Sequence, residues 1–99
     1  MSSAPTFSTG RRPDGAVVLT VTGEIDMSNA EAFATALAQA LPEDDGSLVV
    51  DLTAVEYLDS AGLSVLFPHV EHVHLVAAPL LAPVLTIAGL DDITTIRGS

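Results

Sequence analysis

The sequence predicts a small α/β domain: a mixed β-sheet with helices packed on one face, in the element order β-β-α-β-α-β-α-β. A chain of 99 residues has room for one compact core, so residues 1–99 are expected to form a single domain. The apolar run Leu48–Val50 is typical of a strand buried on both faces. Between Ala30 and Leu41 the apolar residues recur at the spacing of a helix that lies on a sheet.

The first third of the chain predicts a hairpin. Residues 1–6 are small and polar, and we expect them to be a disordered tail. Phe7–Arg12 and Ala16–Thr22 are predicted strands, joined by the Pro-Asp-Gly turn at residues 13–15. In the second strand the apolar residues alternate, so one face is expected to pack on helices while the other is only partly covered.

The first helix follows a polar connection. Gly23–Asp26 is expected to end the second strand and to carry two carboxylates to one edge of the sheet. Ser28 and Glu31 have the spacing of a capping box, in which each side chain satisfies a backbone N–H at the start of a helix. The predicted helix then continues to Leu41, and Pro42 ends it.

The middle of the chain predicts a central strand followed by a second helix. An acidic turn at residues 43–46 leads into Leu48–Val50, and Asp59 is placed as the N-cap of a helix that begins at Ser60. This helix is expected to end near Phe67, because Pro68 disfavours the α conformation in the residue before it. Three residues before Asp59 are expected to return to the core: Val55, Tyr57 and Leu58.

The last third predicts a strand at Val73–Ala77 and a third helix at Leu80–Ala88. Pro83 is compatible with this helix only in its first turn, and Gly89 supplies a C-terminal stop. Ile93–Ile96 is a predicted edge strand.

The amino-acid composition restricts the classes of molecule that this chain could bind. Thirteen acidic residues stand against three arginines and give a formal charge of -10, which excludes nucleic acid and anionic membrane surfaces as partners and favours proteins with basic surfaces. There is no cysteine, so disulfides, a thiol nucleophile and a thiolate metal site are excluded, and a cytoplasmic setting is expected.

Neither a signal peptide nor a membrane span is expected. The first residues lack a basic segment followed by an apolar one. The longest uncharged run, Leu75–Leu90, is shorter than the roughly 20 residues of a spanning helix and is interrupted by Pro79 and Pro83, so it is interpreted as core.

Two short motifs carry a resemblance to a known family. Residues 59–62 read Asp-Ser-Ala-Gly after one strand, and residues 23–26 read Gly-Glu-Ile-Asp after an earlier strand. With these motifs the chain resembles, over Val17–Ile96, the STAS domain of bacterial anti-sigma factor antagonists. The resemblance implies a binding module rather than an enzyme, which captures an anti-sigma factor and so frees a sigma factor, regulating transcription.

The resemblance also implies a switch. In the family the serine of the second motif is phosphorylated by an anti-sigma factor that is also a serine kinase, and by position this is Ser60. A phosphatase would reverse the reaction, and no cofactor or metal is implied. A phosphate on Ser60 is expected to meet free N–H donors at the start of the helix. The residues expected to contact the partner are Glu24, Asp26, Asp59, Ala61 and Gly62.

The chain departs from the family in its second helix, because only Leu63–His72 separates the second motif from the next strand. Roughly two helical turns are missing. The shortened helix is expected to expose Leu66, Phe67 and Val70, which predicts a homodimer or a partner bound at that surface. A freestanding regulatory domain is favoured over one attached to an anion transporter, since no spanning helices precede it.

Other interpretations of the same residues remain open. The chain could be a STAS-type scaffold or a small-ligand sensor in which Ser60 is never modified. Glu24, Asp26 and Asp59 could form a catalytic carboxylate set, or serve as loop acids and a helix cap. A phosphate-binding enzyme is disfavoured because the chain has no lysine and no glycine-rich phosphate loop, and a serine hydrolase because it lacks the G-x-S-x-G elbow.

Three histidines, His69, His72 and His74, stand in one short tract. On a strand only His72 and His74 would share a face, and on a helix only His69 and His72 would. The spacing fits neither state for all three, so we expect no metal and interpret the tract as an exposed connection between a helix and a strand.

Overall fold

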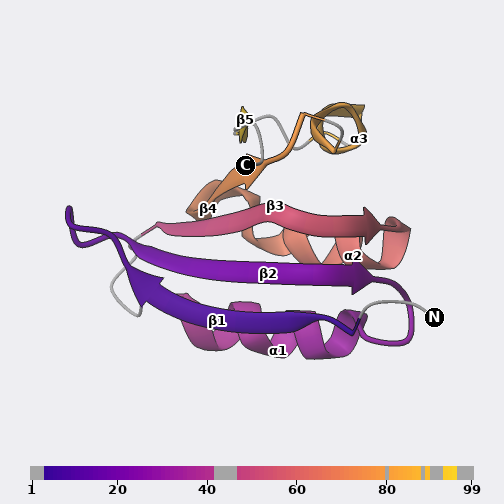
Figure 1. Cartoon of the computed structure of the whole chain (residues 1–99), viewed down its shortest axis with the longest axis horizontal. Helices are drawn as coiled ribbons and strands as arrows, with labels where there is room; N and C mark the ends of the chain where they lie inside the picture. Colours follow the sequence, from indigo (N-terminus) through magenta and orange to yellow (C-terminus); the bar gives the residue numbers. More distant parts are fainter. Residues whose placement is uncertain (1–3, 42–46, 80, 88, 90–92, 96–99) are drawn as a thin grey trace.

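The computed structural model describes residues 4–41, 47–79, 81–87, 89 and 93–95. Within these ranges five strands form one sheet in the order β1-β2-β3-β4-β5, with β1 antiparallel to β2 and every other pair parallel (Figure 1). This mixed sheet confirms the predicted fold class and element order. The elements are β1 (Thr6–Arg11), β2 (Val17–Ile25), α1 (Ala30–Ala40), β3 (Leu48–Leu58), α2 (Ser60–Leu66), the 3-10 helix η1 (Phe67–His72), β4 (Val73–Ala77), α3 (Ala82–Ile87) and β5 (Ile93–Thr95).

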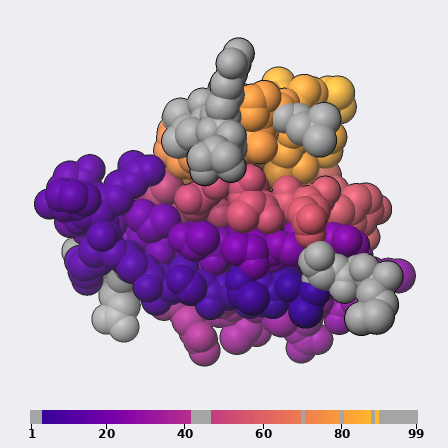
Figure 2. All heavy atoms as spheres, viewed as in Figure 1, coloured from indigo at the N-terminus to yellow at the C-terminus, as the bar shows by residue number. Residues whose placement is uncertain are grey.

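The helices lie on one face because of how the parallel strands are connected. From β2 to β5 each new strand is added on the same side of the previous one, and right-handed crossovers in one direction place all their helices on the same face. In Figure 1, α1 and α2 lie behind the sheet, and Figure 2 shows β1, β2 and β3 forming the near surface. The core lies between the sheet and the helices and includes Leu19, Val21, Ile25, Phe33, Leu37, Leu52 and Leu85.

Helix α1 anchors the sheet through two aromatic rings. Phe33 is fully buried, and its ring is stacked on that of Phe7 from β1, with 6.0 Å between centroids. Leu37, one turn later, is also fully buried, as the apolar spacing predicts. The predicted stop at Pro42 and the acidic turn at residues 43–46 lie outside the described residues.

The prediction that Gly23 ends the second strand is wrong, because β2 continues to Ile25 and pairs with β3 along this extension. Gly23 has φ +85°, a conformation that favours glycine, and a Cβ there would lie 2.7 Å from the carbonyl oxygen of Ala4. The glycine therefore lets the strand bend and lets the N-terminal segment cross it closely.

Strand β3 is longer than predicted and contains two irregularities. Opposite the stretch from Thr20 to Thr22 of β2, strand β3 contains one extra residue. It contains a second extra residue opposite the step from Gly23 to Glu24. Because strict alternation would put Val55 and Leu58 on opposite faces, the second extra residue allows both to be buried. Tyr57 then lies on the other face and is 51% exposed, so the prediction that it returns to the core is wrong.

Helix α2 is short, as predicted, and continues as η1. The helix ends at Leu66, next to the predicted Phe67, although Phe67 itself, with φ -55° and ψ -45°, adopts the α conformation that Pro68 disfavours. Pro68 is instead placed in the first turn of the 3-10 helix, where a missing N–H costs little. Leu66 is buried, contrary to the expected exposure, whereas Phe67 is 45% exposed. The side chain of Val70 lies outside the described residues, and the homodimer stays a prediction.

A proline lies at the start of the third helix and a glycine just after its end, as the sequence predicts. Pro83 is its second residue, and Gly89 has φ +95° and donates its N–H to the carbonyl oxygen of Thr86. The predicted termini Leu80 and Ala88, and the last residue of the predicted edge strand, Ile96, lie outside the described residues. No helix in the described ranges is long and apolar enough to span a membrane.

Candidate functional site

The two motifs meet where β2 and β3 end. These strands are parallel, Ile25 pairs with Leu58, and the N–H of Asp59 donates to the carbonyl oxygen of Ile25 at 3.2 Å. Because parallel strands present their carboxyl ends at the same edge of a sheet, the segments that follow them lie side by side. We call residues 24–28 and 57–62 the Ser60 edge.

Asp59 is the N-cap of α2, as predicted. Its backbone is extended, and one carboxylate oxygen accepts hydrogen bonds from the N–H groups of Ala61, at 2.9 Å, and Gly62, at 3.2 Å. Ser60 is the first residue of the helix and is exposed. The expectation that a phosphate on Ser60 would find free donors is therefore wrong for these two N–H groups, because Asp59 already occupies them.

Gly62 lies beneath this cap, directly on the end of the sheet. It is buried, and a Cβ at this position would collide with the Cδ1 atom of Leu58 and lie 2.8 Å from Cγ2 of Ile25. The absence of a side chain thus lets the start of α2 approach the last paired residues of β2 and β3. Close packing here holds the exposed Ser60 at a defined place.

Replacing Gly62 with alanine tests this close approach. An alanine would gain about 1 kcal/mol of helix propensity, but overpacking costs about 1–3 kcal/mol, so we expect a net loss of up to about 2 kcal/mol in the free energy of unfolding. Urea denaturation measures it. Gly10→Ala is the control, because no atom lies within 4 Å of the Cβ it adds. A stabilised Gly62→Ala variant would show that propensity outweighs the contact.

The other half of the edge is a tight turn around Asp26. The backbone N–H and the hydroxyl of Ser28 both donate to one carboxylate oxygen of Asp26, at 2.9 and 2.5 Å. Asn29 accepts from the N–H of Asp26 and donates its amide to the carbonyl oxygen of Glu24, both at 2.9 Å. The predicted capping box is therefore wrong: Ser28 binds Asp26, and Asn29 occupies the N-cap of α1 without a side-chain capping bond.

These bonds favour the ionised form of Asp26. The hydroxyl of Ser28, then its backbone N–H, lower the pKa of Asp26 below the ordinary value, with a smaller contribution from the Asn29 contact and an opposing one from desolvation. The turn is thus built around a carboxylate rather than a carboxylic acid. It holds negative charge next to Asp59 and Ser60.

Ser28→Ala is expected to raise the pKa of Asp26, because it removes the largest cause of the depression. Carboxyl carbon NMR titration of both proteins measures the shift. A depressed pKa stabilises the fold above about pH 4 and loses that contribution as the pH falls through the folded value, so acid unfolding of the variant should be less steep there. An unchanged Asp26 titration would contradict the assigned cause.

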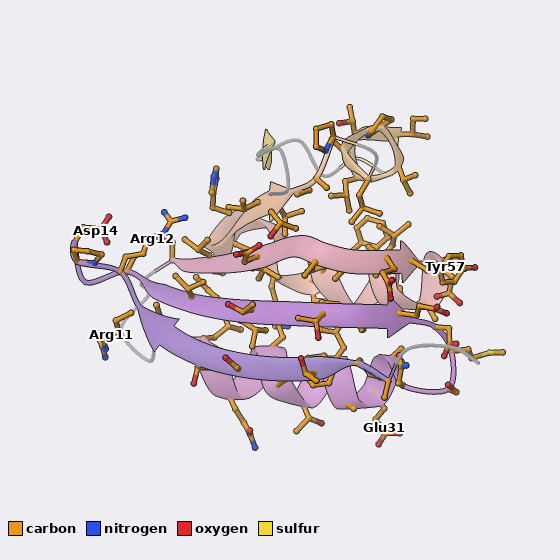
Figure 3. The ribbon with its side chains drawn as sticks, viewed as in Figure 1. Arg11, Arg12, Asp14, Glu31 and Tyr57 are labelled. Atoms are coloured by element: carbon orange, nitrogen blue, oxygen red, sulfur yellow. The ribbon has the colours of Figure 1, made fainter. Side chains whose placement is uncertain are left out.

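The acidic side chains of the Ser60 edge lie far from two of the arginines. Glu24, Asp26 and Asp59 belong to the Ser60 edge, whereas Arg11 and Arg12 precede the β1–β2 turn, which also carries Asp14. Figure 3 shows the two arginines at one end of the sheet and Tyr57 at the other. The Ser60 edge is therefore an acidic surface remote from these arginines.

The two histidines in and just before β4 do not supply a general base for Ser60. Val73 pairs with Leu48, so His72 and His74 lie at the beginning of β3, while Ser60 follows its end. Within the part of the chain that the structure describes, no group of three or more His, Cys, Asp or Glu side chains could hold a metal ion.

One exposed residue of this edge is missing from the sequence-based predictions. Met27 lies in the turn between Asp26 and Ser28 and is 83% exposed. The available signal was its position: a large apolar residue between polar turn residues, next to one of the two motifs. That its turn adjoins the segment with Ser60 follows only from the pairing of β2 with β3.

Comparison with known proteins identifies related sequences and folds. The family model described as "Mlab, STAS domain" matches residues 8–96. The anti-sigma-F factor antagonist RsfB of Mycobacterium tuberculosis is 42% identical over 53 residues, which are 54% of this chain and 43% of that protein. The chain thus matches less than half the length of this curated relative.

Solved structures extend the likeness to almost the whole chain. A crystal structure of an anti-sigma factor antagonist from Mycobacterium paratuberculosis has a TM-score of 0.80 and 31% identity, covering 96% of this chain and 87% of that one. The Bacillus cell fate determinant SpoIIAA in its phosphorylated form has a TM-score of 0.67, covering 93% and 92%. Its 16% identity shows the shared fold alone.

Proposed function

The chain belongs to the STAS domain family, and from this premise we propose that it is an anti-sigma factor antagonist switched off by phosphorylation of Ser60. The observation that carries the proposal is Ser60 itself, an exposed hydroxyl at the first position of α2 on an acidic edge. Similarity to antagonists from two mycobacteria supports the role. In this role the unphosphorylated domain binds an anti-sigma factor and frees a sigma factor for transcription.

The proposed switch is electrostatic. A phosphoryl group adds about -1.5 to -2 charges at neutral pH. Because Asp59 already occupies the N–H groups of Ala61 and Gly62, the added charge stays at the surface among Glu24, Asp26 and Asp59. In an interface where the partner's basic groups already pair with these three carboxylates, a phosphoryl group in place of a small hydroxyl would have to lose its water without a cation of its own, and this desolvation weakens binding.

The partner implied by this chemistry is an anti-sigma factor with serine kinase activity and a basic contact surface. Such a protein would bind the acidic edge, transfer a phosphoryl group from ATP to the hydroxyl of Ser60, and dissociate. A phosphatase that hydrolyses the phosphoserine would restore binding. The net charge of -10 favours this pairing, because it steers the domain toward basic protein surfaces.

The test uses each anti-sigma factor encoded in the genome that carries this gene. Calorimetry with the purified proteins should find one that binds and that releases its sigma factor in competition. Addition of ATP should abolish binding, and mass spectrometry should locate one phosphate on Ser60. If none binds, the proposed function is wrong.

A second candidate is a STAS-type scaffold or small-ligand sensor in which Ser60 is never modified. One observation favours it: α2 has only seven residues before the chain continues as η1. A kinase that recognises a longer helix would lose part of its contact surface. Tight binding without any labelling of Ser60 in the same experiment would favour this candidate.

A further inference from the structure

Two large apolar side chains are exposed at the Ser60 edge. Met27 is 83% exposed and Tyr57 is 51% exposed. They come from segments that the hydrogen bond between Asp59 and Ile25 ties together, Met27 just after β2 and Tyr57 near the end of β3. Large exposed apolar side chains on neighbouring segments, next to polar groups, are typical of a protein interaction site.

Their exposure is imposed by the backbone. Ile25 and Leu58 take the inward positions of the last pair, so Tyr57 must lie on the opposite face, where it pairs with Glu24. Met27 is held in the turn that Asp26 and Asn29 close, through the bond from the N–H of Asn29 to the carbonyl oxygen of Asp26 at 3.2 Å. Both side chains are therefore presented from ordered backbone, which reduces the entropy lost on binding.

The charges around them indicate what they bind. Glu24 pairs with Tyr57, Asp26 precedes Met27, and Asp59 follows the end of β3. Tyrosine and methionine are enriched in the cores of protein interfaces, and a rim of carboxylates is complemented by Arg and Lys on the partner. An apolar pocket with a basic rim fits both features.

We propose that Met27 and Tyr57 are the apolar anchors through which the Ser60 edge docks into a pocket on the anti-sigma factor that is ringed by Arg or Lys. This inference rests on the proposed function and adds which residues supply the affinity. The anchors govern how long the complex lasts, because desolvated contacts at the centre of an interface set the dissociation rate. Glu24 at the rim governs association, which slows as salt screens its charge.

The experiment measures the kinetics of the full chain with each purified anti-sigma factor of the same genome by surface plasmon resonance. Met27→Ala and Tyr57→Ala should each raise the dissociation constant by about 30-fold, mostly through faster dissociation. Met27→Leu and Tyr57→Phe keep the apolar volume and should stay within about threefold of the wild type. Glu24→Gln should slow association and reduce its dependence on salt.

The control is Ile87→Ala, which truncates an equally exposed side chain, 87% exposed, on α3. Circular dichroism and thermal melting establish that all variants are folded. If the wild type binds a factor and both anchor variants bind it as tightly as Ile87→Ala does, the anchor assignment is overturned while the proposed function stands. If the wild type binds none of the factors, both are overturned.

Discussion

Phe33→Ala is expected to lower the free energy of unfolding by about 3–5 kcal/mol, the range for truncating a fully buried phenylalanine. The side chain fills the space between α1 and the sheet, and its ring stacks on Phe7. Its loss would leave a cavity and also remove the partner ring that holds β1, the edge strand, against α1. Small domains are stable by only about 5–15 kcal/mol, so this one change removes a large share.

Urea denaturation followed by far-UV circular dichroism measures the effect. Phe67→Ala is the matched control, because the same atoms are removed from a side chain that is 45% exposed. The control should lose less than about 1 kcal/mol. If Phe33→Ala cannot be purified folded, Phe33→Leu should still show a loss above that of the control. Equal losses at the two positions would contradict the placement of the core.

Ser60→Asp is expected to weaken binding to the anti-sigma factor by about a hundredfold, equivalent to roughly 2.7 kcal/mol. The new carboxylate replaces a small hydroxyl and must lose its water in the interface, at a position where Asp59 has taken the N–H groups of Ala61 and Gly62 and where the partner's basic groups already pair with the native carboxylates. The fold itself should barely change, because Ser60 is exposed. Affinity should therefore fall while the melting temperature stays within a few degrees.

Two further variants separate the effect of the added charge from the effect of its position in the chain. Ser47→Asp introduces the same charge on an exposed residue just before β3, at the opposite end of that strand, and should bind like the wild type. Ser60→Ala should bind normally but lose phosphorylation and its effect. Wild-type affinity for Ser60→Asp, together with continued labelling of Ser60→Ala by the kinase, would refute the switch.

The regular elements could be predicted because each depends on a local pattern. The apolar spacing around Phe33 and Leu37 requires a helix with one buried face, and the alternation in β2 requires a strand with one. Pro83 and Gly89 limit the third helix by backbone geometry alone. Patterns of this kind need no knowledge of which segment lies beside them.

The sequence-based predictions are wrong where a neighbouring segment determines the local structure. Gly23 looks like a strand end, but the adjacent β3 keeps β2 paired beyond it, and the approach of Ala4 explains the glycine. Tyr57 looks like a core residue, yet the extra residue in β3 turns it outward. Ser28 has the spacing of a capping residue, but its hydroxyl donates to Asp26, and α1 begins only at Ala30 with Asn29 as its N-cap.

The candidate site was predictable in position and only partly in composition. Two motifs that follow parallel strands must meet at one edge of the sheet, which is enough to place Asp59 and Ser60 beside Asp26. The exposure of Met27 and the burial of Gly62 depend on a turn and on a helix contact that no local pattern contains. The sequence therefore predicts the position of the Ser60 edge but not the exposed apolar side chain that belongs to it.

The sheet has its strands in the same order as the chain, and this has a consequence for synthesis on the ribosome. Each strand that emerges finds its only earlier neighbour already made, so no strand has to wait for a later one before it can be inserted. By the time Leu58 leaves the exit tunnel, the hairpin, α1 and β3 can assemble. The segment with Ser60 then packs on strands that are already paired. Translation can thus build the fold vectorially, from the N-terminal hairpin outward.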